Sequence, residues 1–404
     1  MLSNNFTSKE LRMKKIMLTL ASALAISSTF ADTVKIGYVT TLTTPQAEVG
    51  EDMKKGAELA LEHLGGKAGS TNLEIIFADD AFKPETGKQV SDRLVKQNKV
   101  DFVTGFIWSH VLLASQKTVL DSGKFLISAN AGPSDMAGKL CHKNFFAIAA
   151  QNDQTPMATG EVFNKMGIKK AYVLAPNFKA GIDMLNGFER TYKGEIVGKS
   201  LTKWGADQQL DFSTELAKIR ASGAEALYIF YPGPAGTTFL SQYDQAGLTG
   251  KVKIFSVYTI DAIALPSLQK ANMPGILDSY MVQEWDQTLD NPTNKKFVSD
   301  FKKKHGYYPS YYGALSYDTI MLIASAVKKL NGDVSDQDKV RAALRAADFN
   351  STRNNFKYGK NHFPVQNFYL RQVVKDSDGV WTTKVIDLVY KDHVDPYASV
   401  CKMR

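Results

Sequence analysis

The chain has 404 residues, of which 44% are hydrophobic and 22% are charged, and its formal net charge at pH 7 is +8. This composition is typical of a globular protein long enough for two domains with separate cores, and it excludes disordered and fibrous proteins. Lys and Arg are scattered among acidic residues and form no basic run interleaved with aromatic residues, so we expect no nucleic-acid partner.

The first residues have the pattern of a secretory signal peptide. Lys14 and Lys15 precede an apolar run from Ile16 to Ile26, and small residues then lead to Ala31. The apolar run is about half of the ~20 residues that a membrane-spanning helix needs, so it targets the chain rather than anchoring it. We therefore predict a signal peptide over residues 1–31 that is cleaved near Ala31.

From Val34 onward, short β-rich segments alternate with amphipathic helical segments, which is typical of parallel sheets with helices on both faces. In the first such unit we expect strands at 34–39, 73–78, 102–105, 125–128 and 145–149, and helices at 50–64, 84–97 and 109–121. In the second we expect strands at 171–174, 196–201, 226–230 and 252–256, and helices at 157–166, 182–192, 212–221 and 236–246. The pattern predicts an α/β fold with two doubly wound, Rossmann-like lobes.

Past about Tyr280 the pattern becomes helical, and two alternating strands end the chain. The expected helices are 294–305, 311–330 and 336–346, and the expected strands are 367–374 and 384–389. Long helices without strand partners must pack on a sheet that is already present, so the chain should return to the first lobe and then to the second. We predict lobe 1 from 32–150 and 282–350, lobe 2 from 151–281 and 351–404, and a three-strand hinge beside a cleft at the carboxyl ends of the strands.

The two cysteines, Cys141 and Cys401, are expected to form a disulfide, because export places the chain in an oxidising compartment. A bridge closing so long a loop would stabilise the fold by about 5 kcal/mol in the chain-entropy model. A metal site at Cys141 and His142 has no second pair of ligands at zinc spacing, so we predict no metal.

The sequence lacks the motifs of catalysis. The nearest approach to a phosphate-binding loop, residues 194–200, has one residue too few between its glycines and leads from a helix into a strand. The histidines fall singly, and Asp79 and Asp80 would point apart in extended backbone. We predict that the protein is not an enzyme and needs no cofactor.

Two loops of the first lobe have the chemistry of an anion site. Residues 105–109 lead into a helix at Ser109, where a hydroxyl lies beside free backbone N–H groups, and His110 belongs to the same region. Residues 128–134 are small enough to let a ligand approach the backbone. Ordinary helix caps and an ordinary Gly-Pro turn explain these residues equally well, so the loops alone leave both interpretations open.

Four segments resemble, in order and spacing, the leucine/isoleucine/valine-type periplasmic binding proteins of ABC transporters: VKIGYVTTLTTPQAEVGEDMKKGAELALEHLGG, VDFVTGFIWSHVLLAS, KFLISANAGPS and AYVLAPNFKAGIDMLNGF. The resemblance implies a type I periplasmic binding fold, a periplasmic location, a small carboxylate ligand and a membrane permease as partner. The segments TGFIWSHVLLAS and ISANAGPSDMAGKLCHKNFF are most similar to the branch that binds aromatic carboxylates such as benzoate- or cinnamate-like acids.

The resemblance also implies ligand contacts. Ser109 matches the serine that holds the ligand carboxylate, and Asn130 and Gly132 match loop positions beside it. Phe178 stands where amino-acid binders have a cleft tyrosine, and Val49 where another aromatic often lies. The acid that binds an ammonium group should fall near Thr259, although Asp261 could replace it if the loop is shifted by two residues. An unpaired ammonium would cost several kcal/mol, about the penalty for a buried charge, so an amino-acid ligand is disfavoured.

Aromatic residues near the expected cleft point the same way, because each ring pair contributes about 0.5–1.5 kcal/mol beyond area burial. Each is equally explained by core packing. We expect a monomer that closes on an aromatic or hydrophobic carboxylate; a branched-chain amino acid binder and a ligand sensor on the same fold remain alternatives. The expected ligand contacts are Trp108, Ser109, Asn130, Gly132, Phe178, Tyr231, Tyr258, Thr259 and Trp285.

Overall fold

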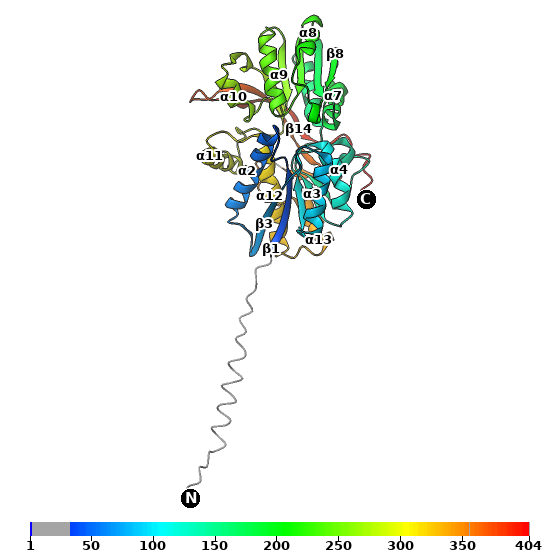
Figure 1. Cartoon of the computed structure of the whole chain (residues 1–404), viewed down its shortest axis with the longest axis vertical. Coiled ribbons are helices and arrows are strands. Elements are labelled where there is room, and N and C mark those ends of the chain that lie inside the picture. Colours follow the sequence, from blue (N-terminus) through cyan, green and yellow to red (C-terminus); the bar gives the residue numbers. More distant parts are fainter. Residues whose placement is uncertain (2–32, 355, 404) are drawn as a thin grey trace. The chain divides into compact units, whose positions relative to one another are not determined.

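Two β-sheets, each flanked by helices, organise the chain from Thr33 onward (Figure 1). This computed structural model describes Met1, residues 33–354 and residues 356–403. Apart from Met1, the predicted signal peptide lies outside the described residues. No helix in the described part of the chain is both long and apolar enough to cross a membrane.

The first sheet has the strand order β2-β3-β1-β4-β5-β6, and all its pairs are parallel except β2 with β3. Its strands are β1 (Thr33–Thr40), β2 (Lys67–Ala68), β3 (Thr71–Asp79), β4 (Phe102–Gly105), β5 (Phe125–Ser128) and β6 (Phe145–Ala147). The helices between them are α2 (Ala47–His63), α3 (Pro84–Lys96), α4 (Ser109–Leu120) and α5 (Ser134–Ala137). Strands β4 and β5 are buried throughout, as expected for parallel strands covered on both faces. We call this sheet and the helices packed on it lobe 1.

The second sheet has the order β12-β13-β11-β10-β9-β7-β8, with β14 paired to β13. Its strands are β7 (Lys170–Pro176), β8 (Glu195–Thr202), β9 (Ala226–Phe230), β10 (Lys253–Val257), β11 (Tyr280–Gln283), β12 (Lys357–Tyr358), β13 (Pro364–Lys375) and β14 (Trp381–His393). Its helices are α6 (Gln154–Lys165), α7 (Lys179–Thr191), α8 (Ser213–Ala221), α9 (Pro234–Gln245) and α10 (Ala264–Lys270), with short 3-10 turns η1 (Gly205–Asp207) and η2 (Pro274–Ile276). This sheet and its helices form lobe 2.

The chain passes between the lobes after β6, after β11 and after α13. Helices α11 (Pro292–His305), α12 (Tyr311–Lys329) and α13 (Gln337–Ala346) return to lobe 1, where α12 packs against α2. Local caps begin these helices, because the side chains of Asn291, Ser310 and Asp336 each accept a backbone N–H of the first turn. The predicted α/β fold with two doubly wound lobes is confirmed. The sequence pattern missed β11, a four-residue strand defined by its neighbours β10 and β13.

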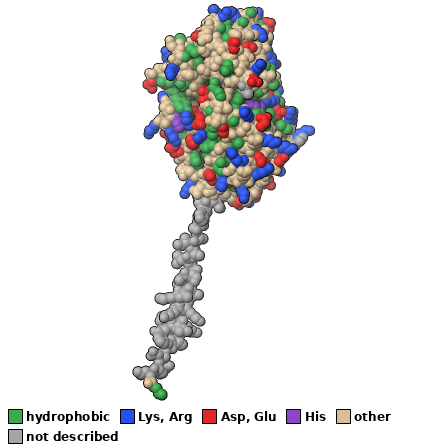
Figure 2. Space-filling model, viewed as in Figure 1, with side chains coloured by type: hydrophobic (Ala, Val, Ile, Leu, Met, Phe, Trp, Pro, Cys, Tyr) green, Lys and Arg blue, Asp and Glu red, His purple; other side chains and the backbone are tan. Residues whose placement is uncertain are grey.

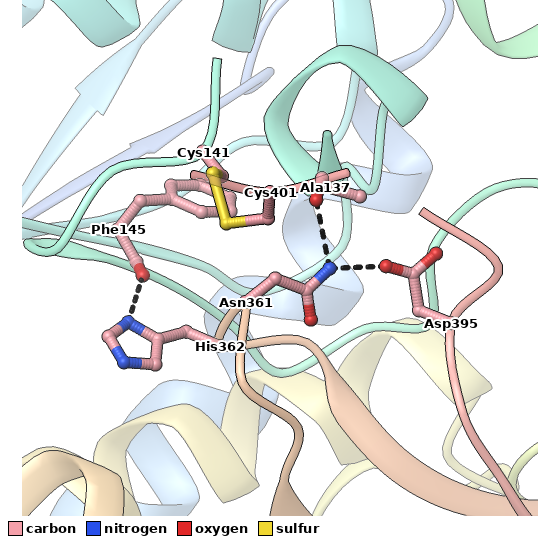
Figure 3. Close-up of a disulfide and its surroundings, with 7 residues drawn as sticks. All are labelled: Ala137, Cys141, Phe145, Asn361, His362, Asp395 and Cys401. Atoms are coloured by element: carbon pink, nitrogen blue, oxygen red, sulfur yellow. Dashed lines mark hydrogen bonds between the residues drawn. A yellow bond between two sulfur atoms is a disulfide. The ribbon is translucent and has the colours of Figure 1, made fainter. Parts of the chain in front are cut away.

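The predicted disulfide between Cys141 and Cys401 is present (Figure 3). It ties the C-terminal segment to the loop between α5 and β6. Beside it, Asn361 Nδ2 donates to the backbone oxygen of Ala137 at 2.9 Å and also to the carboxylate of Asp395. The C-terminal segment is thus held by a covalent bond and by buried hydrogen bonds.

Charges of both signs are interspersed on the visible face of the molecule (Figure 2). Local ion pairs join Lys96 to Asp92 and Lys296 to Asp300, each four residues apart on a helix. Among the residues that the structure describes, no group of three His, Cys, Asp or Glu side chains is arranged to hold a metal ion.

Candidate ligand-binding cavity

A cavity lies between the lobes at the carboxyl ends of their parallel strands, where open α/β sheets bind ligands. The space between its lining atoms is about 380 Å³, a volume that includes open solvent at its mouth. None of the described residues that line it is charged. The residues that line the cavity are Ile107, Trp108, Ser109, Asn130, Ala131, Ala150, Asn152, Phe178, Ala180, Met184, Phe230, Pro232, Tyr258 and Tyr312.

The start of α4 supplies the polar end of the cavity. Gly105 ends β4 with φ 97° and brings its Cα so close to β1 that an added Cβ would lie 2.1 Å from the Val39 carbonyl oxygen. The chain then turns through an extended Trp108 into Ser109, the first helical residue, and no side chain caps the helix. Leu112 is the first residue of α4 whose N–H has a helical acceptor, and no described residue accepts the N–H groups of residues 109–111, which leaves them able to bind an anion.

The Ser109 side chain is buried and accepts a hydrogen bond from Asn152 Nδ2 at 3.1 Å. Asn130 Nδ2 donates to the Ile107 carbonyl oxygen at 2.7 Å, which joins the loops after β4 and β5. A carboxylate placed here would therefore meet a hydroxyl and neutral N–H donors instead of a cationic side chain.

A chain of hydrogen bonds orients Trp108. Its Nε1 donates to Thr41 Oγ1 at 2.8 Å, and that hydroxyl donates to Asp80 Oδ1 at 2.5 Å. Asp80 is fully buried, and burial raises its pKa to about 6. The polar edge of the indole is thus bonded within lobe 1, and the ring offers the cavity apolar surface.

Aromatic rings of lobe 2 form the opposite wall. Phe178 stacks on Trp204 with ring centroids 5.2 Å apart and planes 10° apart, and it also lies 6.1 Å from Phe230. Trp204 reaches across to lobe 1, where its ring lies 5.9 Å from Trp108 and 5.5 Å from Phe82. This aromatic cluster brings the two lobes into contact beside the cavity.

Two tyrosines border the cavity near the crossing segments. The Tyr258 hydroxyl is 2.8 Å from Thr155 Oγ1, and the Tyr312 hydroxyl is 3.5 Å from the Tyr258 carbonyl oxygen. Burial raises the pKa of both phenols well above its ordinary value, so both remain neutral. Each can offer a ligand a neutral hydrogen-bonding group as well as an aromatic surface.

Of the sequence-predicted contacts, the structure brings Trp108, Ser109, Asn130, Phe178 and Tyr258 together around the cavity and places four others outside its lining. A Cβ added at Gly132 would lie 2.1 Å from the Ala150 carbonyl oxygen, so this glycine lets two backbones approach.

Trp285 and Tyr231 lie in cores rather than at the cavity. Trp285 Nε1 donates to Asn294 Oδ1 at 2.8 Å, and its ring packs on Phe297 in lobe 1. Tyr231 packs on Phe239, and its hydroxyl lies 2.8 Å from Thr202 Oγ1.

Neither candidate for ammonium binding lines the cavity. Thr259 Oγ1 accepts the Tyr231 N–H at 2.8 Å and donates to the Val257 carbonyl oxygen at 2.9 Å. Asp261 Oδ1 accepts two backbone N–H groups around the start of α10, at 2.9 and 3.1 Å, and burial raises its pKa to about 7. Both side chains therefore hold the backbone after β10.

Two further residues that the sequence singled out also pack elsewhere. Val49 is fully buried in the core. His110 lies between Phe82 and Phe178, at centroid distances of 5.7 and 5.3 Å, and burial lowers its pKa to about 4.

Sequence reasoning missed Asn152, Met184, Phe230 and Tyr312 in the lining, and Trp204 behind it. Phe230 ends a predicted strand, so the rule that sites lie at carboxyl strand ends could have found it. Tyr312 belongs to an apolar helix whose residues are all expected to pack in the core, and nothing in the local sequence marks it as a cavity residue.

The sequence of this chain matches a known protein family. The periplasmic binding protein family profile matches residues 33–379. The Leu/Ile/Val-binding protein homolog 6 of Brucella melitensis is 26% identical over 391 residues, which cover 94% of this chain and 98% of that protein.

Solved structures show the same fold. A solute-binding protein of an ABC transporter from R. palustris, in complex with benzoate, has a TM-score of 0.83 and 28% identity, and the match covers 92% of this chain and 100% of that one. A branched-chain amino acid transporter substrate-binding protein from Streptococcus pneumoniae, in complex with isoleucine, has a TM-score of 0.76 and 21% identity, with coverage of 88% and 98%. The chain therefore belongs to the periplasmic binding protein family, as a type I solute-binding protein of the leucine/isoleucine/valine-binding group that serves ABC transporters.

Proposed function

We propose that the protein binds a small aromatic carboxylate in the cavity between its lobes and delivers it, unchanged, to a membrane permease. The observation that carries this proposal is the pairing of neutral N–H and O–H donors at the start of α4 with rings from Trp108, Phe178 and Phe230. The donors suit a carboxylate, and the rings suit a flat aromatic group. The benzoate complex of the relative from R. palustris supports the same ligand class.

The lining also argues against an α-amino acid. An ammonium group buried in this cavity needs an acidic partner, because an unpaired buried charge costs several kcal/mol, on the order of the effective desolvation penalty of an ion. None of the described residues that line the cavity is acidic, and Asp261 is occupied by backbone N–H groups. Branched-chain amino acids are therefore expected not to bind, and they are the competing ligands to test.

Isothermal titration calorimetry on protein unfolded, dialysed and refolded to remove bound ligand tests the proposal. Benzoate and 4-hydroxybenzoate should bind, and leucine and isoleucine should not. Ser109→Ala removes a hydrogen bond to a charged group, worth about 1.5–3 kcal/mol, so benzoate affinity should fall about 10- to 150-fold. Ser122→Ala, just past the other end of α4, is the matched control and should bind benzoate like the wild type. Binding of leucine without binding of any aromatic acid would overturn the proposal.

The signal peptide is removed near Ala31, the mature chain works as a monomer in the periplasm, and the closed, ligand-bound form is what the permease recognises. Mass spectrometry of the exported protein tests the cleavage, and size-exclusion chromatography with light scattering tests the monomer. Mass spectrometry of the released ligand after prolonged incubation tests the absence of turnover.

A further inference from the structure

We propose that Asp183, on lobe 2, sets the hydrogen-bond direction of Ser109, on lobe 1, by orienting the side-chain amide of Asn152 between them. Ser109 is thereby made a donor toward the cavity, so that the site selects a carboxylate over the matching neutral amide. The inference rests on the proposed function, because it assumes that the ligand's carboxylate lies at Ser109.

The geometry is a three-residue relay. Asn152 Nδ2 lies 3.1 Å from Asp183 Oδ2 and 3.1 Å from Ser109 Oγ. An amide nitrogen carries two hydrogens and accepts none, and an ionised carboxylate only accepts. The amide of Asn152 must therefore turn its nitrogen toward Asp183, because the reversed amide would place its oxygen against a carboxylate oxygen with no hydrogen between them.

The same orientation determines what Ser109 offers a ligand. Its hydroxyl has one hydrogen to donate, and its oxygen accepts the second N–H of Asn152. Among the described residues, Asn152 is the one hydrogen-bond partner of Ser109 Oγ, so the O–H is left for the cavity. The relative exposure of Ser109, Asp183 and Asn152 is 2%, 2% and 6%, which leaves little room for water to exchange these roles.

Asp183 is itself held so that it cannot turn away. Its Oδ1 accepts from Ser134 Oγ at 2.8 Å and lies 2.9 Å from Lys179 Nζ, and its Oδ2 accepts the Ser134 N–H at 3.1 Å besides Asn152. Lys179 also contacts Asp135 Oδ2 at 2.8 Å. Ser109 belongs to lobe 1 and Asp183 to lobe 2, so the relay is complete only when the lobes are together. The contacts of Ser134 and Asp135 on α5 with Lys179 and Asp183 on α7 join the same two lobes. Closing the cleft therefore also sets the hydrogen-bond direction of the Ser109 hydroxyl.

Asp183→Asn tests the relay with almost no change of shape. Because Lys179 needs an acceptor at the Oδ1 position, the Asn side chain in this variant keeps its oxygen there and turns its nitrogen toward Asn152, with loss of the bond from the Ser134 N–H. Asn152 then presents its oxygen to Ser109. The Ser109 O–H would donate to that oxygen, and its lone pairs would face the cavity and accept from an amide ligand. The measured quantity is the ratio of benzamide Kd to benzoate Kd, by titration calorimetry on refolded, ligand-free protein. This ratio should exceed tenfold in the wild type and fall at least tenfold in Asp183→Asn.

Asp135→Asn is the matched comparison, because Asp135 contacts the same lysine but no atom of Asn152. It should weaken both ligands together and leave their ratio within about twofold of the wild type. In a Ser109→Ala background, Asp183→Asn should no longer change the ratio, because the hydroxyl that it reorients is gone. If Asp183→Asn fails to fold, Asn152→Ala frees Ser109 to donate or accept, and the ratio should again fall.

The outcomes separate the inference from the function on which it rests. If the wild type binds neither benzoate nor another aromatic acid, the proposed function fails and the inference fails with it. If benzoate binds and Ser109→Ala weakens it, but the ratio in folded Asp183→Asn equals that of the wild type, the function stands and the inference is overturned. Equal loss of ratio in Asp183→Asn and Asp135→Asn would also overturn it, because general loosening of the closed lobes would then explain both.

Discussion

Asp79 and Asp80 are neighbours at the end of β3, and their different surroundings predict opposite effects on stability when each is changed to Asn. Asp80 is fully buried, and its Oδ2 has no hydrogen-bond partner among the described residues. Burial raises the Asp80 pKa from 3.8 to about 6, against the lowering effect of the Thr41 hydroxyl and the Phe82 N–H. Asp79 is also partly desolvated, but N–H and O–H donors from Leu42, Thr43 and Ala81 lower its pKa overall.

The magnitude for Asp80 follows from linkage. A raised carboxyl pKa means that the folded state binds the proton more tightly than the unfolded state does, so the contribution of Asp80 to stability is complete below pH 3.8 and is lost as pH rises through about 6. A shift from 3.8 to about 6 corresponds to about 3 kcal/mol at 1.36 kcal/mol per unit. Asp80→Asn keeps an acceptor for Thr41 and removes the charge. It should therefore stabilise the fold by about 3 kcal/mol at pH 8 and by only about 0.5 kcal/mol at pH 4.

Asp79→Asn should instead destabilise the fold at pH 8. The lowered pKa of Asp79 means that its ionised form contributes stability above the unfolded-state pKa, and this contribution is lost as pH falls through the folded-state pKa. Urea unfolding at pH 4 and pH 8, followed by tryptophan fluorescence and by circular dichroism, measures both variants against the wild type. Coincidence of the two probes establishes that the transition is two-state. Loss of stability in Asp80→Asn at pH 8, or the same sign of effect in both variants, would refute the reasoning.

Three further changes test other parts of the structure. Replacing Cys141 and Cys401 by Ser should lower the free energy of unfolding by about 5 kcal/mol, measured in urea with reduced wild type as the control. Phe178→Ala should weaken benzoate binding through loss of ring contact worth about 0.5–1.5 kcal/mol or more, whereas Phe178→Tyr should largely restore it in calorimetry. Gly132→Ala should reduce the melting temperature, because its Cβ would lie 2.1 Å from the Ala150 carbonyl oxygen, and an unchanged melting temperature would contradict that contact.

Local sequence determined the elements of this protein wherever they are long or clearly periodic. Strands β4, β5 and β9 have the predicted bounds, because continuous apolar runs bounded by turn residues identify buried parallel strands without further information. The start of α4 at Ser109 was also predictable, since a buried strand that ends in Gly105, a short turn and a helical segment follow one another there. The proposed anion-binding end of the cavity is therefore formed by one short stretch of chain.

Tertiary structure decided which side chains face that end. Thr259 and Tyr231 follow strands, as a site residue should, but they bond to each other and to lobe 2, because the position of a residue after a strand does not set the direction of its side chain. Tyr312 reaches the cavity only because α12 returns to lobe 1. The link from Asp183 through Asn152 to Ser109 joins residues on separate elements of both lobes, and such long-range polar contacts leave no periodic trace in a single sequence.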